Sequence, residues 1–109
     1  MATVLNDALS MSPNTTLDED LTSESVDLNF CQQVSIQIAW TGTAEGNFYI
    51  QGSNDNQNWV NVTNAQAAGG SSGSAMLEDE NVGYRYCRLF FDSSASTGEL
   101  TLAQINARG

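Results

Sequence analysis

The residues that could carry out chemistry are few in this chain of 109 residues. It contains no histidine, so the most common general base, zinc ligand and catalytic-triad member is absent. Carboxylates occur in two contiguous runs, Asp18–Asp20 and Glu78–Glu80, which we expect to be solvated. A glycosidase needs two carboxylates facing a sugar across a cleft, and a chain of this length has little room for one. We therefore expect no catalytic residue and no enzymatic activity.

Two segments contain oxygen ligands of the kind that calcium prefers. The turn Asn54–Asn56 and the run Glu78–Glu80 could supply some of the six to eight oxygens that this ion takes. Their spacing is not that of an EF-hand, and Asn and Asp side chains that bond to their own backbone explain the turn without a metal. The glycines of 69–73 have no accompanying lysine, which argues against a phosphate-binding loop. We predict no metal ligand and no cofactor, with calcium as the alternative.

Charge restricts the possible partners. Thirteen acidic residues oppose three arginines, giving a net charge of −10 and a pI near 4.1. Phosphate groups require Lys or Arg for neutralisation, so we expect neither nucleic acid nor a membrane as partner. The acidity favours solubility, with attraction to a basic partner or divalent cations as the functional alternative. The N-terminus lacks the pattern of a signal peptide, so we expect the protein to stay in the cytoplasm of the cell that makes it, where Cys31 and Cys87 would be reduced and buried.

Apolar residues alternate along most of the chain, which predicts β-strands. The clearest case is Val34, Ile36, Ile38 and Trp40, which all fall on one side of a strand. The segment 84–91 is apolar on both faces, so we expect a central strand covered above and below. No helical period occurs after residue 25. The expected fold is all-β: an antiparallel β-sandwich or jelly roll of about seven to eight strands, spanning residues 24–109.

Residues 1–23 differ from the rest of the chain. They contain the only proline and an acidic run, and their apolar residues follow no clean period. We interpret them as an extended N-terminal arm that orders on contact with a neighbouring molecule, with a frayed terminus as the equal alternative. The candidate contact residues of this arm are its apolar side chains: Val4, Leu5, Leu9, Met11, Leu17 and Leu21.

For three aromatic residues, the sequence must be examined to tell whether they pack in the core or contact a partner at the surface. Trp40 and Trp59 are in phase with aliphatic residues on their strands, so we place both in the core. Tyr49 falls on the face opposite Phe48 and Ile50, which makes it the candidate for a surface contact. Exposed aromatic rings stack on sugars in lectin-like sandwiches, so a glycan is a possible ligand of this residue and nearby loops.

Several segments together resemble known families. The segment 53–59 (SNDNQNW) resembles the turn and core tryptophan of discoidin-like, galactose-binding-fold sandwiches, and 84–89 (YRYCRL) resembles a later strand of those domains. Together with 40–43 (WTGT) and 98–102 (GELTL), the pattern is similar to small structural proteins of tailed bacteriophages, some of them head decoration proteins. Discoidin domains are usually longer, secreted and closed by a terminal disulfide, unlike this chain.

The resemblance implies a non-catalytic virion protein. The expected function is that of a head decoration (cement) protein, a homo-oligomer that binds the major capsid protein on the capsid surface and stabilises the expanded shell by mass action. The alternative is a glycan-binding adhesion module of a phage tail or fibre, or a carbohydrate-binding domain.

Overall fold

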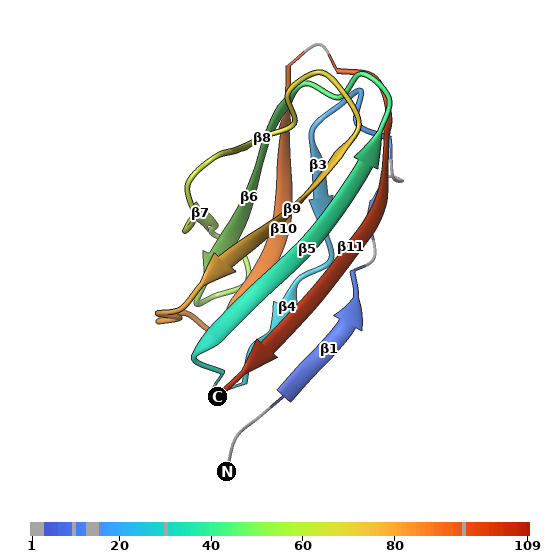
Figure 1. The fold of residues 1–109 in the computed structure, drawn as a ribbon. Helices are drawn as coiled ribbons and strands as arrows, with labels where there is room; N and C mark the ends of the chain where they lie inside the picture. The colour runs from blue at the N-terminus through green and yellow to red at the C-terminus, as the bar shows by residue number, and fades with distance from the viewer. Residues whose placement is uncertain (1–3, 10, 13–15, 30, 95) are drawn as a thin grey trace.

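The structure is a β-sandwich. It is a computed structural model that describes residues 4–9, 11–12, 16–29, 31–94 and 96–109. Within these ranges all regular elements are strands, and two antiparallel sheets face each other (Figure 1). The same ranges contain no helix that is long and apolar enough to cross a membrane. The all-β sandwich expected from the alternating sequence is confirmed.

One sheet has four strands and the other has seven in the described part of the chain. The four-stranded sheet has the order β1 (Val4–Ala8), β11 (Glu99–Arg108), β5 (Gln33–Thr41) and β9 (Gly73–Asp79). The seven-stranded sheet runs β2 (Met11–Ser12), β3 (Leu21–Ser23), β10 (Tyr86–Ser93), β6 (Gly46–Ser53) and β7 (Val60–Asn61), with β4 (Val26–Asp27) paired to β10 and β8 (Gln66–Ala67) paired to β6. The total exceeds the expected seven to eight because β2, β4, β7 and β8 have only two residues each.

The core lies between the sheets, where alternate side chains of the long strands meet. Phe48 on β6 touches both Trp40 on β5 and Phe91 on β10, with ring centroids 5.1 and 4.5 Å apart. Trp40 is 4% exposed, which confirms its expected place in the core. The backbone closes tightly beside this cluster, since Gly46 has a φ of 142° and a Cβ there would collide with the Asp92 carbonyl. Only glycine fits that position without strain.

The predicted division at residue 23 is wrong for the described part of the N-terminal segment. β1 pairs with β11 over five residues, β3 pairs with β10 and β2 pairs with β3, so the segment contributes one strand to the four-stranded sheet and two to the other. Leu9, Leu17 and Leu21 are 8%, 0% and 2% exposed and belong to the core. These three leucines therefore pack inside their own domain, because the last strand leaves apolar surface that the N-terminal segment covers. A contact role for Val4, Leu5 and Met11 stays a prediction.

Both cysteines are buried, as expected. Burial, and then the charge of nearby Cys31, raises the pKa of Cys87 to about 12, so its thiol is neutral at ordinary pH. Burial also raises the pKa of Cys31. Thiolates are the reactive form of cysteine, so neither side chain is activated for chemistry in this environment.

The role of the N-terminal segment can be tested by removing one of its buried side chains. We expect Leu17→Ala to lower the free energy of unfolding by about 2–5 kcal/mol, because it leaves a cavity in the core. Val60→Ala is the control, since Val60 is 64% exposed and its loss should cost less than about 0.5 kcal/mol. Urea denaturation measures both. A Leu17→Ala variant as stable as the control would show that the segment is a frayed arm.

Candidate docking surface

The outer face of the seven-stranded sheet carries aromatic and arginine side chains. Along β6 and β10 the side chains alternate, so Phe48, Ile50, Leu89 and Phe91 point into the core and their neighbours point outward. The outward residues of this face are half-buried rather than covered, because the sandwich has only two layers. The expectation that 84–91 is covered on both faces is therefore wrong. We call the outward set the aromatic face: Tyr49, Trp59, Tyr86, Arg88 and Phe90.

Tyr49 and Phe90 form the centre of the aromatic face. The two residues lie opposite each other in the register of β6 and β10. Their rings stack with centroids 6.3 Å apart and planes 24° apart. Thr22 on β3 is the next residue in the same row. The prediction that Tyr49 points away from the core is confirmed, and its ring is held in place by a neighbour, which lowers the entropy that a partner must overcome on binding.

Trp59 and Arg88 extend the aromatic face toward β7. The guanidinium carbon of Arg88 lies 4.3 Å from the centroid of the Trp59 ring, a cation–π contact. The Arg88 Nε donates to the Gln51 Oε1 at 2.8 Å, and the Gln51 Nε2 donates to the Asn61 Oδ1 at 2.9 Å. The stack and the chain of hydrogen bonds fix the arginine in one orientation. Its partial burial lowers its pKa, but a guanidinium keeps its charge at any ordinary pH.

The placement of Trp59 on this surface corrects the expectation that it packs in the core. Trp59 is half-buried and lies outside the core cluster, whereas Val62, three residues later, packs partly against the core. The strand that was expected to include Trp59 is β7, which has only the residues Val60–Asn61 and begins after the tryptophan. The residues before it form a turn, so the alternation does not extend back to the tryptophan.

A network of hydrogen bonds fixes the conformation of the turn that precedes Trp59. The Ser53 hydroxyl donates to the Asp55 Oδ1 and accepts from the backbone N–H groups of Asp55 and Asn56. The Asp55 carboxylate also accepts from the backbone N–H groups of Asn58 and Gln57 and from the Asn58 side chain. These bonds, the Asn58 backbone bond first, hold the pKa of Asp55 well below its usual range. The Asp55 oxygens, proposed as calcium ligands, thus bond within their own turn, and the Asn54 Oδ1 accepts from the Arg85 backbone N–H.

Tyr86 forms the far end of the aromatic face, and Arg85 lies beside it. Arg85 pairs with Asp27 at 3.1 Å, and its guanidinium carbon lies 5.3 Å from the centroid of the Tyr86 ring. The hydrogen bond from Arg85 is the largest cause that holds the pKa of Asp27 below its usual value. Arg85 and Arg88 are two of the three arginines of the whole chain. Positive charge in this acidic protein is therefore concentrated beside exposed aromatic rings.

The arrangement is suited to contact with another molecule. Trp, Tyr and Arg are the residues that carry most of the binding energy in protein interfaces. Here three aromatic rings and a fixed arginine lie on adjacent strands of one sheet, and the fourth ring, Trp59, lies directly before β7. A surface built on strands keeps its geometry better than one built on loops.

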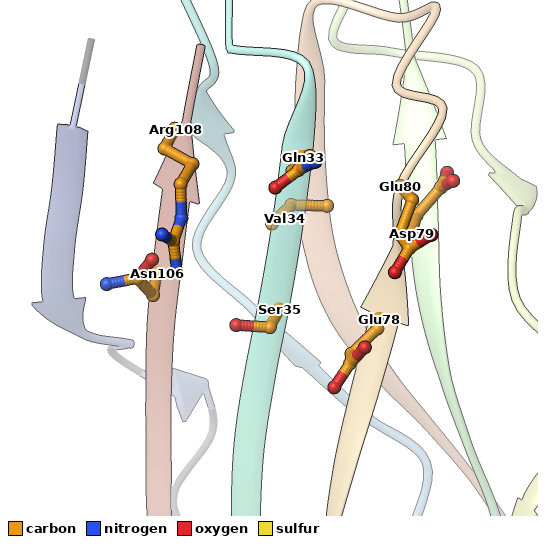
Figure 2. Close-up of a pocket in the computed structure, with 8 residues that line it drawn as sticks. All are labelled: Gln33, Val34, Ser35, Glu78, Asp79, Glu80, Asn106 and Arg108. Carbon is orange, nitrogen blue, oxygen red and sulfur yellow. The ribbon is translucent and has the colours of Figure 1, made fainter. Parts of the chain in front are cut away.

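The other sheet offers a different surface. Arg108, Asn106, Ser35 and Glu78 lie in neighbouring rows on the outer side of β11, β5 and β9, beside a shallow depression of about 140 Å³ (Figure 2). Pockets that hold drug-sized ligands are roughly twice as large or more. Asp79, at the end of β9, accepts from the Tyr84 hydroxyl at 2.7 Å. Within the described ranges, no three Asp, Glu or Cys side chains gather as a metal site would require.

No protein-family model and no curated protein sequence matches this chain. Its structure is similar to the crystal structure of the SPBc2 prophage-derived protein YomS. The two chains superimpose with a TM-score of 0.67 at 10% sequence identity, over 100% of this chain and 96% of YomS. The likeness shows that the complete described sandwich, N-terminal strands included, is a fold shared with a phage-derived protein. The discoidin-like assignment stays a prediction.

The exposure of Trp59 can be tested by fluorescence quenching. We expect wild-type protein to show one tryptophan accessible to acrylamide and one protected, because Trp40 is 4% exposed and Trp59 is half-buried. Trp59→Phe should leave only the protected Trp40, so the quenching constant should fall severalfold. Tyr49→Phe is the control on the same face and should leave quenching unchanged. Equal quenching of Trp59→Phe and wild type would contradict this placement.

Proposed function

We propose that this protein is a non-catalytic structural component of a tailed bacteriophage particle, a decoration protein that binds the major capsid protein on the capsid surface. The observation that supports this most is the aromatic face. It offers the residue types that dominate protein–protein binding, on an outer face where their side chains are partly accessible. The full-length likeness to a prophage-derived protein supports the phage origin.

The proposed mechanism is thermodynamic. A protein that binds the expanded shell and not its precursor stabilises that shell by mass action. Each contact need not be strong, because many copies act on one particle. The aromatic face replaces the N-terminal arm as the proposed contact, since three of the six candidate contact residues of the arm are buried in the domain. The high negative charge then keeps free copies apart during assembly.

The proposal predicts that purified protein co-sediments with expanded capsids of the phage that encodes it. Binding should saturate, and it should weaken about thirtyfold or more in Trp59→Ala and in Arg88→Ala, which remove candidate hot-spot residues. Glu78→Gln, on the opposite sheet, is the control and should bind like wild type. Circular dichroism confirms that each variant is folded.

Two outcomes would count against the proposal. If wild-type protein does not bind either expanded or precursor capsids, the decoration role is wrong. If it binds but the two aromatic-face variants bind equally well, another surface makes the contact.

The aromatic face also supports a second candidate, glycan binding. Sugars stack on exposed aromatic rings and bond to planar polar groups, and Tyr49, Gln51 and Asn61 lie together on this face. A glycan array with the wild-type protein tests this function. Reproducible binding that is lost in Tyr49→Ala would favour an adhesion module over a decoration protein.

A further inference from the structure

On the outer face of the four-stranded sheet, the middle of β5, β9 and β11 is almost free of charge in an otherwise acidic protein, with Glu78 at its edge. Its outward side chains in the middle of β5, β9 and β11 are amides, hydroxyls and small or apolar groups. We call this set the neutral face: Ser35, Gln37, Ala39, Ser74, Met76, Leu102, Gln104 and Asn106. Met76 and Leu102 are 49% and 37% exposed, which is unusual for large apolar side chains of this molecule. In Figure 1 this face is turned toward the viewer and no segment crosses it.

The rows of the neutral face are self-complementary. Gln104, Gln37 and Met76 form the middle row across the three strands, with the row of Asn106, Ser35 and Glu78 on one side. The row of Leu102, Ala39 and Ser74 lies on the other side. Two copies can be related by a two-fold axis that lies in the plane of the interface and runs perpendicular to the strands. This axis places the middle row of one copy against the middle row of the other. Each flanking row then faces the other flanking row of the second copy. No carboxylate of these rows then faces another carboxylate.

Charges of opposite sign mark the two ends of β11. Glu99 begins the strand and Arg108 ends it, and both point outward and are exposed. The ion pair within the described chain is between Arg85 and Asp27, so neither of these two end charges takes part in it. The same two-fold axis reverses β11 and brings Arg108 of one copy to Glu99 of the other, twice. Charge complementarity of this kind fixes register and excludes wrong partners.

From these observations we infer that the neutral face binds a second copy of this chain, as an antiparallel face-to-face dimer. Like-charged copies can approach only where charge is absent or complementary, and this face satisfies both conditions. Small residues such as Ala39 and Ser74 let two sheets approach to the spacing of a normal sandwich. The inference goes beyond the proposed function and does not depend on it, because it concerns the purified protein alone.

The size of the face indicates a weak dimer. Strand and residue spacings give roughly 500 Å² per copy, or roughly 1,000 Å² in total. Stable interfaces bury about 1,200 Å² or more, so this one is at the lower limit. We therefore expect a dimer whose population rises with concentration, in rapid exchange with the monomer.

Sedimentation velocity of the full chain over a range of concentrations tests the dimer. Wild-type protein should move from monomer to dimer as concentration rises. Met76→Glu should remain monomeric, because it places two carboxylates together at the two-fold axis. Val60→Glu adds the same charge at another exposed apolar residue, on β7, and is the matched control that should dimerise like wild type.

Charge reversal tests the orientation. Glu99→Arg should weaken dimerisation at least about tenfold, although it reduces the net charge from −10 to −8 and so reduces general repulsion. Arg108→Glu should weaken it too, and the double variant should restore it. These two residues are exposed, so the variants keep the fold even if Met76→Glu does not. The inference would be overturned if the wild-type protein stayed monomeric at all concentrations, or if the control variant Val60→Glu did not dimerise. It would also be overturned if the double variant did not dimerise like wild type.

Discussion

The contact of Phe48 with Trp40 and Phe91 holds the sandwich together. Phe48 and Phe91 belong to the seven-stranded sheet and Trp40 to the four-stranded sheet, so this cluster joins the two layers. Once these rings face inward, the period of two forces the residues beside them to face outward. Tyr49 and Phe90 therefore point outward and are half-buried for the same reason that Phe48 and Phe91 are buried. The core determines which residues the surface presents.

The acidic residues are distributed so that the faces of both sheets stay largely free of them. The runs Asp18–Asp20 and Glu78–Glu80, and single residues such as Glu45 and Asp55, lie in turns or near strand ends. There they repel other copies at the edges, where exposed strands otherwise invite pairing. The same distribution leaves one sheet face aromatic and the other neutral. Net charge in this protein thus limits which surfaces can make contact.

The long strands could be predicted from the sequence. Contacts between residues that are far apart along the chain could not. Val34 to Trp40 alternates over a full strand, so its inner face could be recognised directly. Leu17 is buried because β11, at the other end of the chain, leaves a site for it, with its N–H bonded to the Gly98 carbonyl. A contact between residues so far apart in the sequence leaves no periodic pattern in the residues around Leu17. Residues without periodicity were therefore interpreted as an arm although they complete both sheets.

The aromatic face shows a second limit of the same reasoning. Tyr49 could be assigned to the surface because it lies within a regular strand between two core residues. Trp59 was misplaced because the hydrogen-bonded turn at 53–58 changes the direction of the chain before β7 begins. Its arginine neighbour comes from β10, and that pairing across the sheet depends on strand order. Strand order is a property of the whole fold, which alternation alone does not specify.

The two proposed contact surfaces lie on opposite sides of the sandwich, and this restricts how they can act together. A face-to-face dimer directs its two aromatic faces outward in opposite directions, separated by four sheet layers or roughly 30 Å. Only one copy of such a dimer can touch a given shell. The dimer therefore does not increase affinity for a single shell by two-site binding, and it would add an outer layer or connect two particles. Multiple binding to one shell must come instead from many copies side by side, each held by its own aromatic face.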